Sequence, residues 1–447
     1  MNPILIKNAQ IVNEGVVFRG DVLVEKDQIA EVSESISVKS ADTKVIDADG
    51  MYLVPGMIDD QVHFREPGLT HKATIETESK AAVAGGITSY IEMPNTVPQA
   101  TTIELLEDKF AIAENTSWAN YSFMFGGTND NLDEILKVDE TKVAGLKLFL
   151  GSSTGNMLVD DPKVLEKIFS NTKLLISAHC EDEATIKKNL EKHIAQYGDD
   201  IPVALHPKIR SEEACYISSS KAIALAKKTG ARLHVFHLST EKETHLFSNK
   251  KPLAEKKITA EVCIHHLWFT EADYATKGTK IKWNPAVKSE KDREGLWKAL
   301  NDDRIDVIAT DHAPHTLEEK ENVYTNAPSG GPLVQHALEA LFEMHHKGRI
   351  TVENIVQKTA HNPAILFQIK DRGFIKRGYK ADLVLIDPNS PWTVNKENIA
   401  YKCGWSPFEG TTFKSRVTHT LVNGVLVYEN GKYPNRGKGE RLTFNRG

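Results

Sequence analysis

The 447-residue chain has little of what defines several large protein classes. Its four cysteines are scattered and form no Cys-x-x-Cys pair, so neither a disulfide framework nor a cysteine-ligated zinc cluster is expected, and a reducing cytoplasm is the simplest compartment. No apolar run approaches the roughly 18–20 residues of a membrane span, and the N-terminus lacks a signal-peptide pattern. Basic residues number 55 against 61 acidic ones, which argues against nucleic acid or an anionic membrane as the main partner.

Both ends of the chain contain short β-type runs separated by glycines. The tail includes two apolar runs joined by Asn423-Gly424, which is a strong hairpin pattern. Neither end is long enough to bury a core alone. We therefore expect residues 1–54 and 371–447 to form one small β-sandwich domain, with residues 55–370 inserted between them.

The middle of the chain alternates between strand-like and helix-like segments. The strand-like runs are 53–58, 87–93, 121–125, 145–150, 174–178, 232–238, 258–264 and 305–309. Helical spacing is found between them, for example in 103–114, 162–169, 218–228 and 291–300. This alternation favours a parallel sheet with helical crossovers, and eight such units predict a (β/α)8 TIM barrel.

Residues capable of chemistry fall repeatedly at the same ends of the predicted strands. They are His63, Asn95, Lys147, His179, His237 and Asp311. Active sites of this barrel are built at the C-terminal ends of the strands. We therefore expect these side chains to meet at one mouth.

Three of these residues are histidines, and one is an aspartate. Each histidine alone is more often a hydrogen-bonded core residue than a ligand. Together, His63, His179, His237 and Asp311 offer the nitrogen and oxygen donors that zinc prefers, without sulfur. As a metal ligand, Asp311 could also accept the proton of metal-bound water, although a carboxylate there could merely cap the next segment.

Lys147 is an amine in an otherwise apolar strand. One interpretation is that it extends to water at the barrel mouth. The other is that burial keeps it neutral, so that it reacts with carbon dioxide to give a carbamate able to bridge two metal ions. The neighbouring metal donors make the second interpretation the preferred one.

Arg65 lies two residues after His63 and could clamp a substrate carboxylate bidentately; the alternative is a salt bridge to Glu66 or another acid at the rim. His312 and His315 cannot both be ligands on spacing alone, and His315 is better placed to face a substrate. The segment 76–78 and the pairs 187–188 and 250–251 are interpreted as solvated surface.

Several longer motifs resemble those of dihydroorotases in the amidohydrolase superfamily. They are Pro-Gly-Met-Ile-Asp-Asp-Gln-Val-His-Phe-Arg-Glu-Pro-Gly at 55–68, Glu-Met-Pro-Asn-Thr at 92–96 and Ala-Thr-Asp-His-Ala-Pro-His at 309–315. The resemblance extends through Gly-Tyr-Lys-Ala-Asp-Leu at 378–383 to Asn423-Gly424, which is nearly the whole chain. It implies reversible, zinc-dependent ring closure of N-carbamoyl-L-aspartate to dihydroorotate in pyrimidine synthesis.

The resemblance also implies roles for individual residues. His63 and Asp311 would be metal ligands, His179 and His237 would bind a second metal, and a carboxylated Lys147 would bridge the two. Asp311 would also be the catalytic acid and base. Substrate would be held by Arg65, Asn95, Asn284, His315 and the backbone around Ser329 and Gly330.

Two positions depart from the resemblance. Gln61 stands where the family usually has a histidine ligand, and an amide oxygen is the weaker zinc donor, so one of two zinc sites is expected to be weak or empty. Lys288 stands where arginine is commoner, which affects substrate positioning. The alternatives are a hydantoinase- or allantoinase-like enzyme and an inert structural partner of another pyrimidine-pathway enzyme. Exterior helices of a barrel also offer surfaces for a homo-oligomer.

Overall fold

A barrel of eight parallel strands forms the centre of the protein. The computed structural model describes residues 2–38, 40–151 and 157–446. The barrel strands are hydrogen-bonded in chain order, and a backbone bridge joins Val62, the last residue of the first strand, to His312, which follows the last strand. They are β6 (Met57–Val62), β7 (Ile87–Glu92), β8 (Asn120–Gly126), β9 (Gly145–Phe149), β10 (Ile176–His179), β11 (Leu233–Val235), β12 (Ile258–Cys263) and β13 (Val307–Ala309). The predicted (β/α)8 barrel is confirmed.

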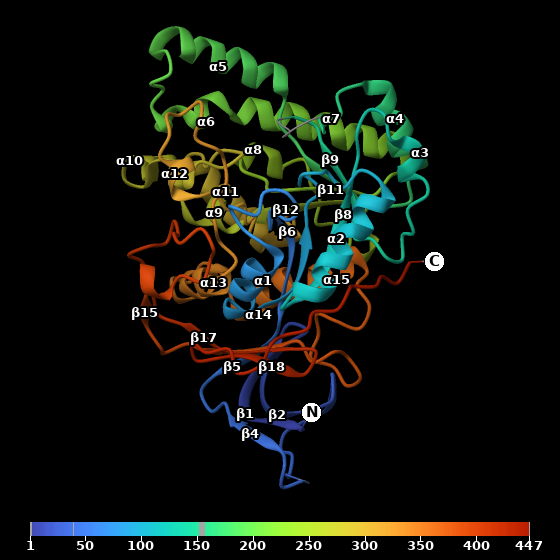
Figure 1. Ribbon diagram of the computed structural model, residues 1–447, viewed down its shortest axis with the longest axis vertical. Coiled ribbons are helices and arrows are strands. Elements are labelled where there is room, and N and C mark those ends of the chain that lie inside the picture. Colours follow the sequence, from blue (N-terminus) through green and yellow to red (C-terminus); the bar gives the residue numbers. More distant parts are fainter. Residues whose placement is uncertain (1, 39, 152–156, 447) are drawn as a thin grey trace.

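Helices surround this barrel (Figure 1). The longer ones are α1 (Ile75–Ala84), α2 (Ile103–Thr116), α4 (Pro162–Asn171), α5 (Glu183–Tyr197), α7 (Glu212–Thr229), α11 (Glu290–Asn301) and α13 (Ala337–His346). The shorter ones are α3 (Leu132–Ile135), α6 (His206–Ile209), α8 (Glu241–Thr244), α9 (Ile264–Trp268), α10 (Tyr274–Lys277), α12 (Leu317–Lys320), α14 (Val352–Val356) and α15 (Asn362–Phe367). Side-chain caps start many of them; for example, Thr102 accepts from the backbone N–H of Leu105. Within the described residues, no helix combines the length and apolar composition of a membrane span.

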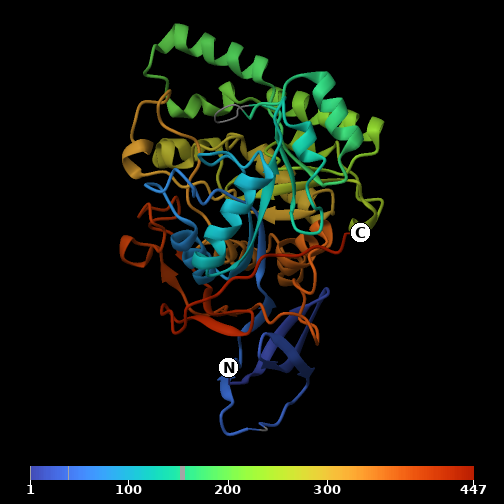
Figure 2. The same ribbon diagram turned by 45° about the vertical axis from the view of Figure 1, so that its right-hand side comes forward.

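The two ends of the chain build a second, mixed sheet. Its strands are β1 (Ile4–Asn13), β2 (Val16–Glu25), β3 (Gln28–Ser33), β4 (Lys44–Asp47), β5 (Tyr52–Pro55), β14 (Leu383–Asp387), β17 (Arg416–Val422) and β18 (Val425–Glu429). The antiparallel pair β5–β14 joins the N-terminal strands to the C-terminal ones. This sheet lies below the barrel in Figure 1, and the N-terminal strands project furthest from it in Figure 2. The β-rich domain drawn from both termini is therefore one sheet, in which β4 pairs with β1 beside the hydrogen-bonded path of the other strands.

Two local predictions have different outcomes. Asn423 and Gly424 form the turn between β17 and β18, and both have the positive φ that this tight hairpin requires. The single strand predicted over 53–58 is wrong, because the chain divides there into β5 of the mixed sheet and β6 of the barrel. Gly56 lies at the division, where an added Cβ would be 2.1 Å from the Thr88 hydroxyl. Only glycine leaves room at this position for the Thr88 side chain of β7.

A buried polar network connects the mixed sheet to the barrel. Arg372 forms an ion pair with Asp382 and donates to the Asn423 side chain at 2.7 Å. Asp382 also accepts from the side chain of Asn120, the first residue of β8, at 3.1 Å. Arg372 and Asp382 are 5% exposed each. Loss of one partner would therefore leave a buried charge unpaired.

The variant Arg372→Ala is expected to lower the free energy of unfolding by about 3–5 kcal/mol, the usual cost of breaking a buried ion pair. Its denaturation midpoint, followed by circular dichroism, measures this loss. The exposed Arg19 is a matched control, because its ion pair with Asp49 lies in water, and Arg19→Ala should leave the midpoint almost unchanged. Equal midpoints for Arg372→Ala and the wild type would contradict the prediction.

Candidate active site

A cavity of about 230 Å³ lies among the ends of the barrel strands and the loops that follow them. Its lining residues are Gln61, His63, Arg65, Asn95, Lys147, Phe149, His179, His237, Trp283, Asn284, Asp311, Ala313, His315, Pro328, Ser329 and Gly330. Every residue that the sequence predicts for the site is among them. The convergence of side chains at one mouth, expected from their places after the strands, is present in the structure.

Three lining residues reach the cavity through unusual backbone geometry. Arg65, His237 and Asp311 have φ angles of 68°, 39° and 48°, in the left-handed region that residues with a Cβ seldom adopt. Each lies just after a barrel strand, so the strained turn redirects the chain at the strand end. Such angles cost on the order of 1–3 kcal/mol and cluster at functional sites.

His63 and Asp311 form the first pair of metal-capable donors. His63 Nε2 lies 3.2 Å from Asp311 Oδ1, and His63 Nδ1 donates to the side-chain oxygen of Asn95 at 2.8 Å. Burial lowers the pKa of His63, which favours the neutral ring. A proton held on Nδ1 by Asn95 leaves the lone pair on Nε2, beside the Asp311 carboxylate. This is the tautomer that a metal-ligating histidine needs.

His179 and His237 form the second pair. His179 Nδ1 and His237 Nε2 are 3.0 Å apart, and His179 Nε2 donates to Glu181 at 2.9 Å. Burial lowers the pKa of both imidazoles, and for His237 the nearby His179 and Lys147 lower it further. The two facing nitrogens are thus placed to direct their lone pairs at one cation, with Glu181 as the supporting carboxylate behind His179.

Glu181 is itself held as an anion. It is fully buried, and burial alone would raise its pKa, but the ion pair with Arg210 and the hydrogen bond from His179 outweigh burial and lower the pKa to about 2. A permanent negative charge behind His179 fixes the proton on its Nε2 and raises the basicity of Nδ1.

Lys147 is 1% exposed, so it does not extend to water as one interpretation of the sequence proposed. Its ammonium lies 4.1 Å from the ring centroid of Phe236 and 4.9 Å from that of Phe149. Within the described residues it forms no hydrogen bond or ion pair. Burial lowers the pKa of Lys147 to about 8, only partly offset by the charges of Glu261 and Asp311. The side chain is a buried amine with a substantial neutral fraction.

Arg65 is, after Lys147, a second basic residue of the cavity that has no carboxylate partner among the described residues. Its Nε donates to the Pro314 carbonyl at 3.0 Å, and a terminal nitrogen lies 3.0 Å from His315 Nε2. Glu66, the alternative partner considered from the sequence, accepts instead from the backbone N–H of Ile75. Burial lowers the pKa of Arg65 to about 10, which still leaves it charged at neutral pH. The guanidinium is therefore available to a bound anion.

The two histidines of the 309–315 motif have different environments. His315 lines the cavity, and its Nε2 also contacts the Ser329 carbonyl at 3.0 Å. His312 points away from the cavity, where its Nε2 donates to Glu78 at 2.8 Å and its Nδ1 accepts from the Leu333 N–H. The interpretation of Glu78 as solvated surface is wrong: it is fully buried and holds His312. The pairs 187–188 and 250–251 are exposed.

The remaining predicted substrate contacts are backbone or amide groups. The side-chain oxygen of Asn284 is buried and has no hydrogen-bond partner in the described structure. Gly330 has a φ of 126°, and a Cβ there would be 2.5 Å from the Ala313 carbonyl, so glycine is required. Lys288, the departure from the family motif, donates instead to Ser239 at 2.9 Å and does not line the cavity.

Sequence reasoning missed a second group of donors deeper in the barrel. Asp60, His234 and Glu261 each place one ligand atom within 4.8 Å of the others. Adjacent aspartates at 59 and 60 in the first barrel strand, and a histidine in an apolar strand, were the available signals.

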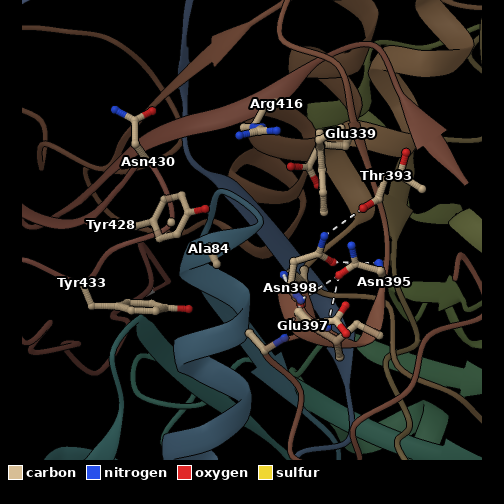
Figure 3. Close-up of a pocket in the computed structure, with 15 residues that line it drawn as sticks. Ala84, Glu339, Thr393, Asn395, Glu397, Asn398, Arg416, Tyr428, Asn430 and Tyr433 are labelled. Atoms are coloured by element: carbon tan, nitrogen blue, oxygen red, sulfur yellow. Dashed lines mark hydrogen bonds between the residues drawn. The ribbon is translucent and has the colours of Figure 1, made fainter. Parts of the chain in front are cut away.

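A larger cavity of about 630 Å³ lies elsewhere, between α1, α13 and the C-terminal strands (Figure 3). Asn395, Asn398, Tyr428 and Tyr433 are among its lining residues, and Figure 3 shows their side chains around the end of α1 at Ala84. It contains none of the predicted metal donors. This cavity is the larger of the two, but the smaller one is the candidate active site because it contains the metal-capable side chains.

Residues 52–427 match the Amidohydrolase family. The chain belongs to this family. It is 35% identical to a protein named dihydroorotase from Carboxydothermus hydrogenoformans, over 95% of this chain and 98% of that protein. A protein of the same name from Methanosarcina acetivorans is 32% identical over 99% of this chain and 96% of its own length.

Among solved structures, the L-hydantoinase (dihydropyrimidinase) of Arthrobacter aurescens superposes with a TM-score of 0.93 and 27% identity, covering 99% of this chain and all of that one. The prediction of a metal-dependent cyclic amidohydrolase is confirmed by these likenesses together with the family match.

Proposed function

We propose that this amidohydrolase is a dihydroorotase, which interconverts (S)-dihydroorotate and N-carbamoyl-L-aspartate in pyrimidine synthesis. The observation that carries the proposal is Arg65: a buried guanidinium, without a carboxylate partner among the described residues, in the same cavity as the metal-capable donors. Dihydroorotate carries a ring carboxylate, and arginine is the side chain best suited to bind it in two places. The names of the relatives support the same substrate.

The donor set fits zinc, because it combines imidazole nitrogens with a carboxylate oxygen, and Asn95 and Glu181 hold the protons of His63 and His179 on the ring nitrogens that face away from the partner donors. One ion would be held by His63 and Asp311 and another by His179 and His237, with Lys147, as a carbamate, between them. When bound, zinc supplies Lewis acidity and lowers the pKa of water. Gln61 offers only an amide oxygen beside the first pair, so we propose that the ion there is the weaker one.

Substrate binding and proton transfer would fall to residues of the chain itself. Arg65 and Asn95 would hold the substrate carboxylate, and the Asn284 amide and the backbone at Ser329 and Gly330 would orient the ring. Asp311, 4% exposed beside His63, would take the proton from the attacking water and pass it to the departing ring nitrogen. Ring closure follows the same proton path backwards.

Hydantoin hydrolysis is the second candidate, because the Arthrobacter aurescens structure with a TM-score of 0.93 is a hydantoinase. Simple hydantoins present the same cyclic amide without the carboxylate. A dihydroorotase therefore needs Arg65 to bind the substrate carboxylate, whereas a hydantoinase does not.

The variant Arg65→Met tests the proposal. It should lower kcat/KM for dihydroorotate by about 10²- to 10⁴-fold, because two charge-assisted hydrogen bonds of about 1.5–3 kcal/mol each are lost. Turnover of unsubstituted hydantoin should change little. The matched control Arg65→Lys keeps the charge but cannot donate two parallel hydrogen bonds. Its kcat/KM for dihydroorotate should lie between those of the wild type and Arg65→Met.

Three results would count against this function. A wild type that turns over hydantoin and dihydroorotate equally well would favour the hydantoinase. Equal losses on both substrates in Arg65→Met would show that Arg65 does not read the carboxylate. A wild type with neither bound metal nor turnover would favour the inert structural partner.

A further inference from the structure

A compact cluster of polar side chains lies inside the barrel, separate from the residues proposed to act on substrate. Asp60 comes from β6, His234 from β11 and Glu261 from β12, and all three are 0% exposed. Asp60 and His234 lie within their strands, three residues before His63 and His237, which follow the strand ends, so the cluster lies deeper in the barrel. The rings of Phe236 and Phe367 pack against His234 at centroid distances of 5.3 and 6.0 Å.

The atoms of the cluster that face one another lack hydrogen-bond partners in the described structure. In the described structure, both oxygens of Asp60, Nε2 of His234 and Oε2 of Glu261 have no hydrogen bond. His234 Nε2 is 3.2 Å from Asp60 Oδ2 and 3.9 Å from Glu261 Oε2, yet neither contact has hydrogen-bond geometry. Buried polar atoms are almost always satisfied, and these four face a common centre where one ligand could satisfy them together.

Neighbouring groups fix the direction of these free atoms. His234 Nδ1 lies 2.8 Å from the Thr259 hydroxyl, which itself donates to the Leu233 carbonyl. The hydroxyl therefore accepts the Nδ1 proton, and the His234 lone pair is left on Nε2. Glu261 uses its other oxygen to accept from the His237 N–H and the Cys263 thiol. A lone pair facing two carboxylates is repulsive unless a cation lies between them.

The geometry points to a buried site for one divalent transition-metal cation, held by Asp60, His234 and Glu261. One imidazole with two carboxylates selects Zn²⁺ or Mn²⁺ over Ca²⁺ or Mg²⁺, which prefer oxygen alone. Ligand atoms of a tetrahedral zinc ion lie about 3.3–3.4 Å apart. The 3.2 Å between His234 Nε2 and Asp60 Oδ2 is close to this value, and the 3.9 Å to Glu261 Oε2 is somewhat wider. The cation would neutralise the two carboxylates and tie β6, β11 and β12 together beneath the mouth. The inference of this buried cation site does not depend on which substrate the enzyme uses.

Because the site is closed to solvent, its ion would be captured during folding and retained afterwards. The test is metal analysis by mass spectrometry of the full chain, expressed with zinc and then treated with EDTA under native conditions. The wild type should keep about one zinc per chain, and so should the double variant His179→Asn/His237→Asn, in which the mouth is disabled. Asp60→Asn should keep none.

Asp59→Asn is the matched control. Asp59 is also a fully buried aspartate of β6, but its carboxylate already accepts from the N–H and hydroxyl of Thr310, so its loss should not change the retained zinc. Circular dichroism establishes that each variant is folded. Equal retention in Asp60→Asn and the wild type, or no retained metal in the wild type, would overturn the proposal.

Crystals of the wild type give a second measurement that needs no variant. Data collected on both sides of the zinc edge should show an anomalous peak within coordination distance of His234 Nε2. Density there without an anomalous signal would identify a water molecule and overturn the cation. A peak only at His179 and His237 would do the same, while leaving the proposed dihydroorotase activity intact.

Discussion

Replacing Lys147 by alanine is expected to lower dihydroorotate turnover by about 10³-fold or more and to reduce the zinc bound at the mouth at the same time. The reason is the chemistry proposed for its amine. With a pKa of about 8, roughly a tenth of Lys147 is neutral at pH 7, against about one part in 3,000 for an exposed lysine. The neutral nitrogen would attack carbon dioxide and lose a proton, which would give the anionic carbamate proposed to lie between the two metal sites.

Two further results separate a carbamate from a simple positive charge. Acetate or propionate should restore part of the metal and activity of Lys147→Ala, because a free carboxylate can occupy the space of the carbamate. Lys147→Arg keeps a cation but cannot form the carbamate, so it should be as inactive as the alanine variant. Full activity of either variant, measured as kcat alongside zinc content, would show that the carbamate is not required.

Much of the fold could be predicted from the positions of the strand-like runs, and much of the site from the residues that follow those runs. Eight apolar runs separated by helical spacing already indicate the barrel. A residue that follows a parallel strand must lie at the barrel mouth, whatever its distance along the chain. His63 and Asp311 are 248 positions apart in the sequence, yet their side chains are 3.2 Å apart in the structure.

The features that could not be predicted depend on departures from regular strands. The apolar run at 53–58 gives no sign that the chain leaves one sheet and enters another at Gly56. Strict alternation would place Asp60 and Gln61 on opposite faces, but the register of β6 against β7 shifts between Asp59 and Val62. As a result Gln61 lines the cavity while Asp60 contacts His234 inside the barrel.

Glu78 shows a different difficulty. Its segment is charged and begins a helix, which usually indicates solvent exposure. Its burial depends on His312, which lies 234 positions further along the chain. A charged residue is buried only with a partner, and local sequence does not identify that partner.

Replacing Asp311 by asparagine is expected to lower kcat by about 10³-fold while leaving the fold intact, because the variant removes the proposed proton acceptor and the proposed charged metal ligand together. The substitution suits this position. Asp311 has a φ of 48°, and asparagine is one of the few residues that adopt the left-handed region readily. The hydrogen bond from Trp283 reaches the backbone carbonyl of residue 311, so it is retained.

Asp306 provides the matched control for this variant. It too is a buried aspartate, but it forms an ion pair with Lys256 at 2.6 Å and does not line the cavity. Asp306→Asn should lower the unfolding midpoint and leave kcat per folded molecule unchanged. Asp311→Asn should leave the midpoint unchanged and lower kcat. If Asp311→Asn kept more than about a tenth of the wild-type kcat, proton transfer would have to be assigned to another group, since general acid–base catalysis alone contributes about 10²- to 10⁴-fold.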